Sequence, residues 1–214
     1  MAVTVRRRVA VELATLAVLA STFLTLLPER PVWVDALLGL VAVTLVVATA
    51  RTTREQIWTP ATARRDPVRH AWRDLLIATL AVALLFAIIG RWTGRAGPLF
   101  TATMLAALIP FTLWAALQQL LFQFYLLGRL RALLLPASPA FAIAALNGAL
   151  FGAVHLPDVE LAVLTSIGGA VWSWHYMRDR CLAPIALSHA VLGTTYYYWV
   201  RGEDLLLRWL SMAG

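Results

Sequence analysis

An uncharged run of 29 residues, Leu99–Leu127, constrains the fold more than any other part of the sequence. As one α-helix it would be ~44 Å long, because each residue adds ~1.5 Å, whereas the hydrocarbon core of a bilayer is ~30 Å thick. The helix must therefore tilt, protrude or kink, and Pro110 is the natural kink point because it cannot donate to the carbonyl four residues back.

Three amides, Gln118, Gln119 and Gln123, interrupt the second half of this run. An amide in hydrocarbon without a hydrogen-bond partner costs ~4–8 kcal/mol on the least forgiving transfer scale. Polar groups at this depth usually face the interior of a helix bundle. The glutamines therefore predict a polar site inside the protein, unless they only bond across helices as packing contacts worth ~0.6 kcal/mol each.

Apolar segments recur along the whole chain, which is 61% hydrophobic and only 14% charged, whereas a soluble domain has about 25% charged residues. We predict an all-α, polytopic transmembrane helix bundle of about seven spans, in a single integral membrane domain over residues 1–214. An alternative for the segment after Arg6-Arg7-Arg8 is a signal peptide, but the six spans that follow favour an uncleaved first span. The expected spans are the first, ending near Leu27, then about Val32–Ala50, Leu75–Gly90, Leu99–Leu127, Ala140–Val154, Leu161–Met177 and Leu182–Val200, with an amphipathic tail at Asp204–Met212.

The net charge of +7 would suggest nucleic acid as the partner of a soluble protein. Here the arginines gather between apolar segments, and most fall in alternate loops on the side of the N-terminus, above all in residues 51–74. We therefore expect no nucleic-acid partner, a multi-pass protein of the cell (inner) membrane, and a cytoplasmic N-terminus.

Two later spans each carry one histidine that could meet the glutamines. His155 ends the span that begins at Ala140, four residues after Phe151, and His189 precedes Gly193 by four residues in the last span. From ~1.5 Å per residue, the depths of these groups are close enough to converge if the helices tilt. We predict that Gln118 or Gln119, His155 and His189 line one interior cavity.

We expect neither a metal nor another cofactor at this site. Two histidines without a nearby buried carboxylate or thiolate fall short of the three protein ligands of a catalytic zinc site. The single Cys181 cannot form an intramolecular disulfide, and no cysteine pair suggests a thiolate site.

Taken in order, the polar positions resemble the CPBP family, the CAAX-type proteases and bacteriocin-processing proteins of the ABI group, which includes the type II CAAX prenyl endopeptidases. The family's Glu-Glu-x-x-x-Arg motif corresponds to 118–123, with Gln118, Gln119 and Gln123 at its polar positions. Phe151 and His155 meet its Phe-x-x-x-His motif. His189 meets its His-x-x-x-Asn motif, with Gly193 in the last position. The resemblance covers residues 105–200 as a CPBP-like core.

The resemblance implies an intramembrane endopeptidase that acts on a membrane-embedded peptide or on a prenylated or otherwise hydrophobic protein. Its catalytic positions are Gln118, Gln119, His155 and His189, and we expect the remaining motif positions, Gln123, Phe151 and Gly193, to contact substrate. In the family a motif-one Glu and the first His activate water, while the second His and the Asn stabilise the oxyanion.

The residues of this chain put that chemistry in doubt. The amide of Gln cannot act as a general base, which needs a pKa near the working pH. Gly193 brings no side-chain donor, and one lost oxyanion donor can cost ~2.7–4 kcal/mol. Two interpretations stay open: an endopeptidase with unusual residues, or a catalytically silent relative that binds a membrane peptide, a lipid or a protein partner. A transporter-like bundle is disfavoured because internal repeats are not evident and no span is expected to carry a buried carboxylate for proton coupling.

Overall fold

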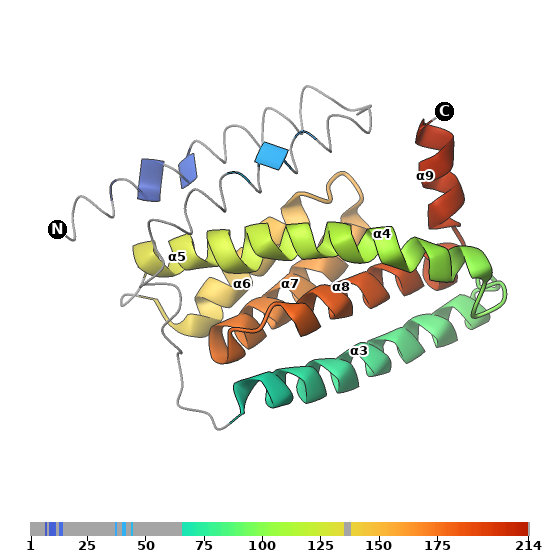
Figure 1. The fold of residues 1–214 in the computed structure, drawn as a ribbon, viewed down its shortest axis with the longest axis horizontal. Coiled ribbons are helices and arrows are strands. Elements are labelled where there is room, and N and C mark those ends of the chain that lie inside the picture. Colours follow the sequence, from blue (N-terminus) through green and yellow to red (C-terminus); the bar gives the residue numbers. More distant parts are fainter. Residues whose placement is uncertain are drawn as a thin grey trace. The chain divides into compact units, whose positions relative to one another are not determined.

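The computed structural model describes residues 66–134 and 138–213, with a few single residues between 7 and 44. The first two expected spans and most of the loop at 51–74 lie outside the described residues, so the count of seven spans stays a prediction. Every element within 66–134 and 138–213 is helical, which confirms the all-α class (Figure 1).

Most helices begin and end close to the positions that hydropathy and the proline and glycine breakers predict. The elements are α3 (Pro67–Trp92), α4 (Ala102–Gln119), the π-helix η1 (Leu120–Leu126), α5 (Leu127–Leu134), α6 (Ala140–Ala153), α7 (Val159–Asp179), α8 (Ala183–Thr195), the π-helix η2 (Tyr196–Arg201) and α9 (Leu205–Ala213). Pro110, the expected kink point, lies inside α4, and the helix changes from α to π at Leu120.

Among the described residues, two helices are long and apolar enough to cross a membrane: α3, and the continuous 33-residue helix Ala102–Leu134 that α4, η1 and α5 form together. Only 28% of the most apolar window of each is buried. Large apolar side chains such as Leu84 and Ile109 are 62% and 71% exposed. A helix in the core of a soluble protein would bury such residues, so their exposure favours contact with lipid.

The contacts of the chain divide it into two compact units. The first unit comprises residues 1–61 and 120–178, and the second comprises residues 62–119 and 179–214. The candidate residues lie on four helices and one turn: η1, α6 and the turn after α6 belong to the first unit, and α4 and α8 belong to the second.

In the second unit, α8 packs against both α3 and α4, η2 packs against α3, and α9 packs against α4. Gly90 allows the approach of α3 to η2, because a Cβ there would lie 2.7 Å from the carbonyl carbon of Trp199. The indole of Trp199 also donates to the carbonyl of Leu99, at 2.7 Å. The helix that carries His189 is thereby held against both α3 and α4.

In the first unit, α6 packs against η1 and α5 and approaches α7 closely through two glycines. A Cβ at Gly148 would lie 2.8 Å from the Cα of Ala170, and one at Gly152 would lie 3.0 Å from the Cβ of Ser166. Small residues of this kind let helix backbones approach closely in membranes. The turn after α6, which carries His155, therefore lies beside the first half of α7.

Candidate functional site

Gln119 and His189 form a buried pair between α4 and α8 in the second unit. Gln119 is fully buried as the last residue of α4, and His189 is 5% exposed. The Nε2 of Gln119 lies 3.1 Å from the Nδ1 of His189. Because an amide nitrogen can only donate, Nδ1 accepts in this arrangement and the imidazole carries its proton on Nε2. The pair is uncharged, and it brings one motif-one glutamine into contact with His189.

Phe111 occupies the space beside Gly193 that a side chain at position 193 would need. A Cβ at Gly193 would lie 2.5 Å from the Cζ of Phe111 and closer still to its Cε1. The ring stands edge-on to His189, with centroids 6.0 Å apart, and it stacks on Trp209 of α9 at the same separation. Position 193 therefore has no side chain, and the ring of Phe111 fills the space that one would need.

A second buried contact fixes α8 next to His189. The hydroxyl of Thr79 on α3 donates to the Oγ of Ser188 at 2.7 Å, and both side chains are buried. Two buried hydroxyls that lose this hydrogen bond would stay unpaired in apolar surroundings, which costs free energy. The bond therefore favours one rotation of α8 about its axis against α3.

Gln123 enters a different network, in the first unit. Its Oε1 accepts from the Nδ2 of Asn147 at 3.3 Å, and the same Nδ2 lies 2.8 Å from the Oγ of Ser173. Ser173 in turn donates to the carbonyl of Gly169 at 2.6 Å. All three polar side chains are fully buried. The position that is Arg in the family is thus a cross-helix contact that joins η1, α6 and α7, which favours the packing interpretation for Gln123.

Phe151 lies at the centre of an aromatic cluster and is fully buried. Its ring centroid is 4.8 Å from that of Phe122, 5.9 Å from that of Trp172 and 5.1 Å from that of His155. A residue so enclosed shapes the wall behind His155, so direct contact of Phe151 with a substrate stays a prediction.

His155 is half-buried in the turn between α6 and α7. Its Nδ1 lies 2.8 Å from the carbonyl oxygen of Phe151. A carbonyl only accepts, so Nδ1 carries the proton and Nε2 keeps its lone pair. In its neutral form, His155 therefore presents an Nε2 that can accept a proton.

The candidate residues thus fall into two groups. Gln118, which is half-buried on α4, belongs to the second unit with Gln119, His189 and Gly193, whereas Gln123, Phe151 and His155 belong to the first. A single cavity lined by residues of both groups stays a prediction.

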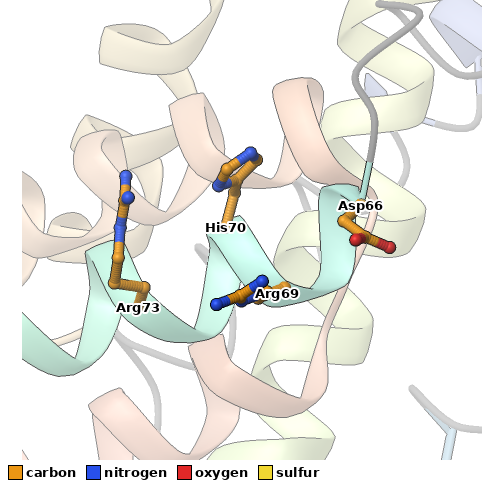
Figure 2. A pocket seen from close by; sticks show the side chains of 4 residues that line it. All are labelled: Asp66, Arg69, His70 and Arg73. Atoms are coloured by element: carbon orange, nitrogen blue, oxygen red, sulfur yellow. The ribbon is translucent and has the colours of Figure 1, made fainter.

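A surface concavity of ≈370 Å³ lies at the start of α3, and none of its lining residues is a candidate residue. It is lined by Asp66, Arg69, His70 and Arg73, which all come from α3 and the residue before it (Figure 2). Arg69 and Arg73 are exposed. The concavity is the surface of one basic helix end, and it adds no group to the candidate site.

Sequence reasoning missed Phe111, Thr165 and Ser173. A signal for Phe111 existed: the buried residues of α4 recur every three or four positions, and Phe111 lies eight residues before Gln119 on that stripe. Thr165 and Ser173 gave no signal, since single hydroxyls are common in membrane helices and most bond to a carbonyl of the preceding turn.

The family comparison agrees with the motif order. Residues 100–195 match the sequence model of the family described as Type II CAAX prenyl endopeptidase Rce1-like. Over these residues the chain is similar to the CAAX-type proteases. This Rce1-like region contains all of the candidate residues and nearly coincides with the core expected at 105–200. No curated protein and no solved structure matches the chain. The family is integral to membranes, in agreement with the two membrane-length helices.

Proposed function

We propose that this CAAX-protease-like protein binds a prenylated or otherwise hydrophobic peptide segment within the membrane and does not hydrolyse it through a Glu-activated water. The observation that carries the proposal is the buried, uncharged pair of Gln119 and His189. In the family this motif supplies a carboxylate. An amide at the same place can orient a ligand by hydrogen bonding but cannot take a proton from water.

The surroundings of Gly193 support the same function. A side-chain donor for an oxyanion is missing at this position, and Phe111 fills the space that one would need. Removal of one such donor costs ~10²–10³ in kcat. The ring instead offers apolar surface next to His189, which suits a hydrophobic chain better than a developing negative charge.

The proposal takes Gln118 or Gln119, His155 and His189 to line one ligand site within a single membrane domain, as the motif order of the family implies. The expected ligands are a membrane-embedded peptide or a prenylated protein; a lipid is the other candidate of similar chemistry. The location proposed is the cell (inner) membrane, with the N-terminus in the cytoplasm.

Slow hydrolysis is a second candidate function, and one observation favours it. The lone pair on Nε2 of His155 is available to act as a general base, because Nδ1 holds the proton. His155 would then work without the carboxylate that assists it in the family.

The test measures binding and cleavage of the same probe. The purified protein in liposomes is mixed with a dye-labelled peptide that carries a C-terminal farnesylated Cys motif, or with the same peptide without the farnesyl group. Fluorescence anisotropy reports binding and mass spectrometry reports cleavage. We expect the farnesylated peptide to bind and to remain intact, and we expect His155→Ala and Gln119→Leu to weaken binding.

The matched control is His70→Ala, which removes an imidazole outside the candidate residues and should bind like the wild type. Turnover that disappears in His155→Ala would replace the binding function with the second candidate. Equal binding of both peptides, or binding unchanged in Gln119→Leu and His155→Ala, would contradict the proposed site.

A further inference from the structure

The environment of the Nδ1 atom of His155 contains two acceptors that come from different helices. The carbonyl oxygen of Phe151, at the end of α6, lies 2.8 Å from Nδ1. The Oγ1 of Thr165, on α7, lies 3.3 Å from the same atom.

The hydroxyl of Thr165 has one proton, and the geometry shows where it goes. Oγ1 lies 2.6 Å from the carbonyl oxygen of Leu161 and 3.3 Å from that of Ala162. A carbonyl can only accept, so the short contact with Leu161 takes the proton. Toward His155 the hydroxyl therefore presents a lone pair, and Nδ1 must be the donor.

The local sequence explains why these groups meet. Gly152 lets α6 come so close to α7 that a Cβ there would lie 3.0 Å from the Cβ of Ser166. Ser166 is the neighbour of Thr165 in the chain. Asp158 accepts from the backbone amide of Leu161 at 3.1 Å and so begins α7 directly after the turn. The position of His155 against Thr165 is thus set by backbone packing rather than by a mobile side chain.

We propose that Thr165 is a positioning residue for His155. With the carbonyl of Phe151, it holds the imidazole in the tautomer that is protonated on Nδ1 and presents the unprotonated Nε2 to the ligand. The ligand group that Nε2 recognises is then a hydrogen-bond donor, such as a backbone N–H of the bound peptide or a water molecule. This inference deepens the proposed function and rests on it only for the role of Nε2.

Nitrogen NMR of the ¹⁵N-histidine-labelled protein in detergent measures the tautomer directly, because protonated and unprotonated ring nitrogens have different shifts. The chain has four histidines, and the signals that disappear in His155→Gln identify those of His155. We expect the unprotonated signal on Nε2 in the wild type. In Thr165→Val, loss of one acceptor should lower the ratio of the two tautomers roughly five-fold, the size of one net hydrogen bond.

Thr165→Ser keeps the hydroxyl and should retain the wild-type ratio. The matched control is Thr112→Val, because the Oγ1 of Thr112 also donates to the carbonyl four residues back, at 2.6 Å, but on α4. That variant removes an equivalent helix hydroxyl and should leave the His155 signals unchanged. If Thr165 had a purely structural role, Thr165→Val would leave both ring-nitrogen signals of His155 unchanged.

An unprotonated Nδ1 in the wild type, or a Thr165→Val spectrum identical to that of the wild type, would overturn the inference even if the farnesylated peptide binds. If instead the tautomer shifts as expected but His155→Ala binds the peptide normally, the positioning of His155 by Thr165 stands and the proposed function fails.

Discussion

The contact between Gly193 and Phe111 predicts that a single methyl group at position 193 destabilises the protein. In Gly193→Ala the new Cβ would lie 2.5 Å from the Cζ of Phe111, about 1 Å short of an ordinary carbon–carbon contact. The ring cannot move freely, because it packs between His189 and Trp209.

The expected size of the effect is the difference between two opposing terms. Overpacking of a filled interior costs about 1–3 kcal/mol. Replacing Gly by Ala within a helix gains up to about 1 kcal/mol. Overpacking should win, with a net loss of about 1–2 kcal/mol in the free energy of unfolding.

A double-mutant cycle with Phe111→Leu tests the cause, with unfolding measured by denaturant titration in mixed micelles. In the Phe111→Leu background Gly193→Ala should be neutral or stabilising, which gives a coupling of about 1 kcal/mol or more between the two positions. The matched control is Gly168→Ala on α7, where the nearest atom to the new Cβ is a Trp172 ring carbon at 3.4 Å. Wild-type stability of Gly193→Ala, together with additivity in the cycle, would refute the reasoning.

Three further predictions concern other parts of the chain. Asn147→Ala should cost about 1–3 kcal/mol because it leaves Gln123 buried without its donor, whereas Asn147→Leu combined with Gln123→Leu should recover much of that loss in the same titration. Asp204→Ala should lower stability by about 1 kcal/mol, because this carboxylate caps α9. Burial opposes its ionisation, but hydrogen bonds hold the pKa of Asp204 below its usual value. The stabilisation by Asp204 is therefore present above the unfolded-state pKa and lost as the pH falls through the lower folded-state pKa. Thermal melts over a pH series should show this loss of stability in the wild type but not in Asp204→Asn. Finally, single cysteines at Thr52 and Thr93 in a Cys181→Ser background should react from opposite sides of the membrane, and labelling of Thr52→Cys from outside by an impermeant reagent would contradict the cytoplasmic N-terminus.

Hydropathy and strong breakers predicted the helices of the described region but not all of their ends, since α3 begins at Pro67 rather than at Leu75 and the long helix continues to Leu134 rather than ending at Leu127. The apolar segment expected at Ala140–Val154 forms the helix α6 at Ala140–Ala153, and the last expected segment forms α8 with η2; that they cross the membrane stays a prediction. The change of helix type at Leu120 was not predictable. A 3.6-residue period places Gln119 and Gln123 on one face, but Gln119 bonds to α8 whereas Gln123, within the π-helix, bonds to α6. Segments of π-helix occur often at functional sites.

The candidate site was predictable only as far as motif order reaches. The order of the motifs brought Gln119 and His189 to attention, and the structure places them in contact. Motifs carry no information on which apolar side chain fills a space, so the ring of Phe111 beside Gly193 could not be foreseen. The same holds for Thr165, because its contact with His155 depends on how closely two glycines bring α6 to α7.

The departures from the family pattern are consistent with one another, and this favours a site adapted to binding over a protease that has lost one residue. Gln119 is matched by a neutral His189, since the amide donates to Nδ1 and no charge needs a counter-ion. Gly193 is matched by Phe111, because the ring fills the space that a Cβ at position 193 would need. Restoring a carboxylate at Gln119 alone would put a charge at a fully buried position, where it is costly unless His189 takes up a proton to pair with it. Restoring Asn at Gly193 alone would drive a side chain into an occupied space. If the protein binds a hydrophobic peptide without Glu-activated hydrolysis, as proposed, we expect recovery of that chemistry to need changes at Gln119, Gly193 and Phe111 together.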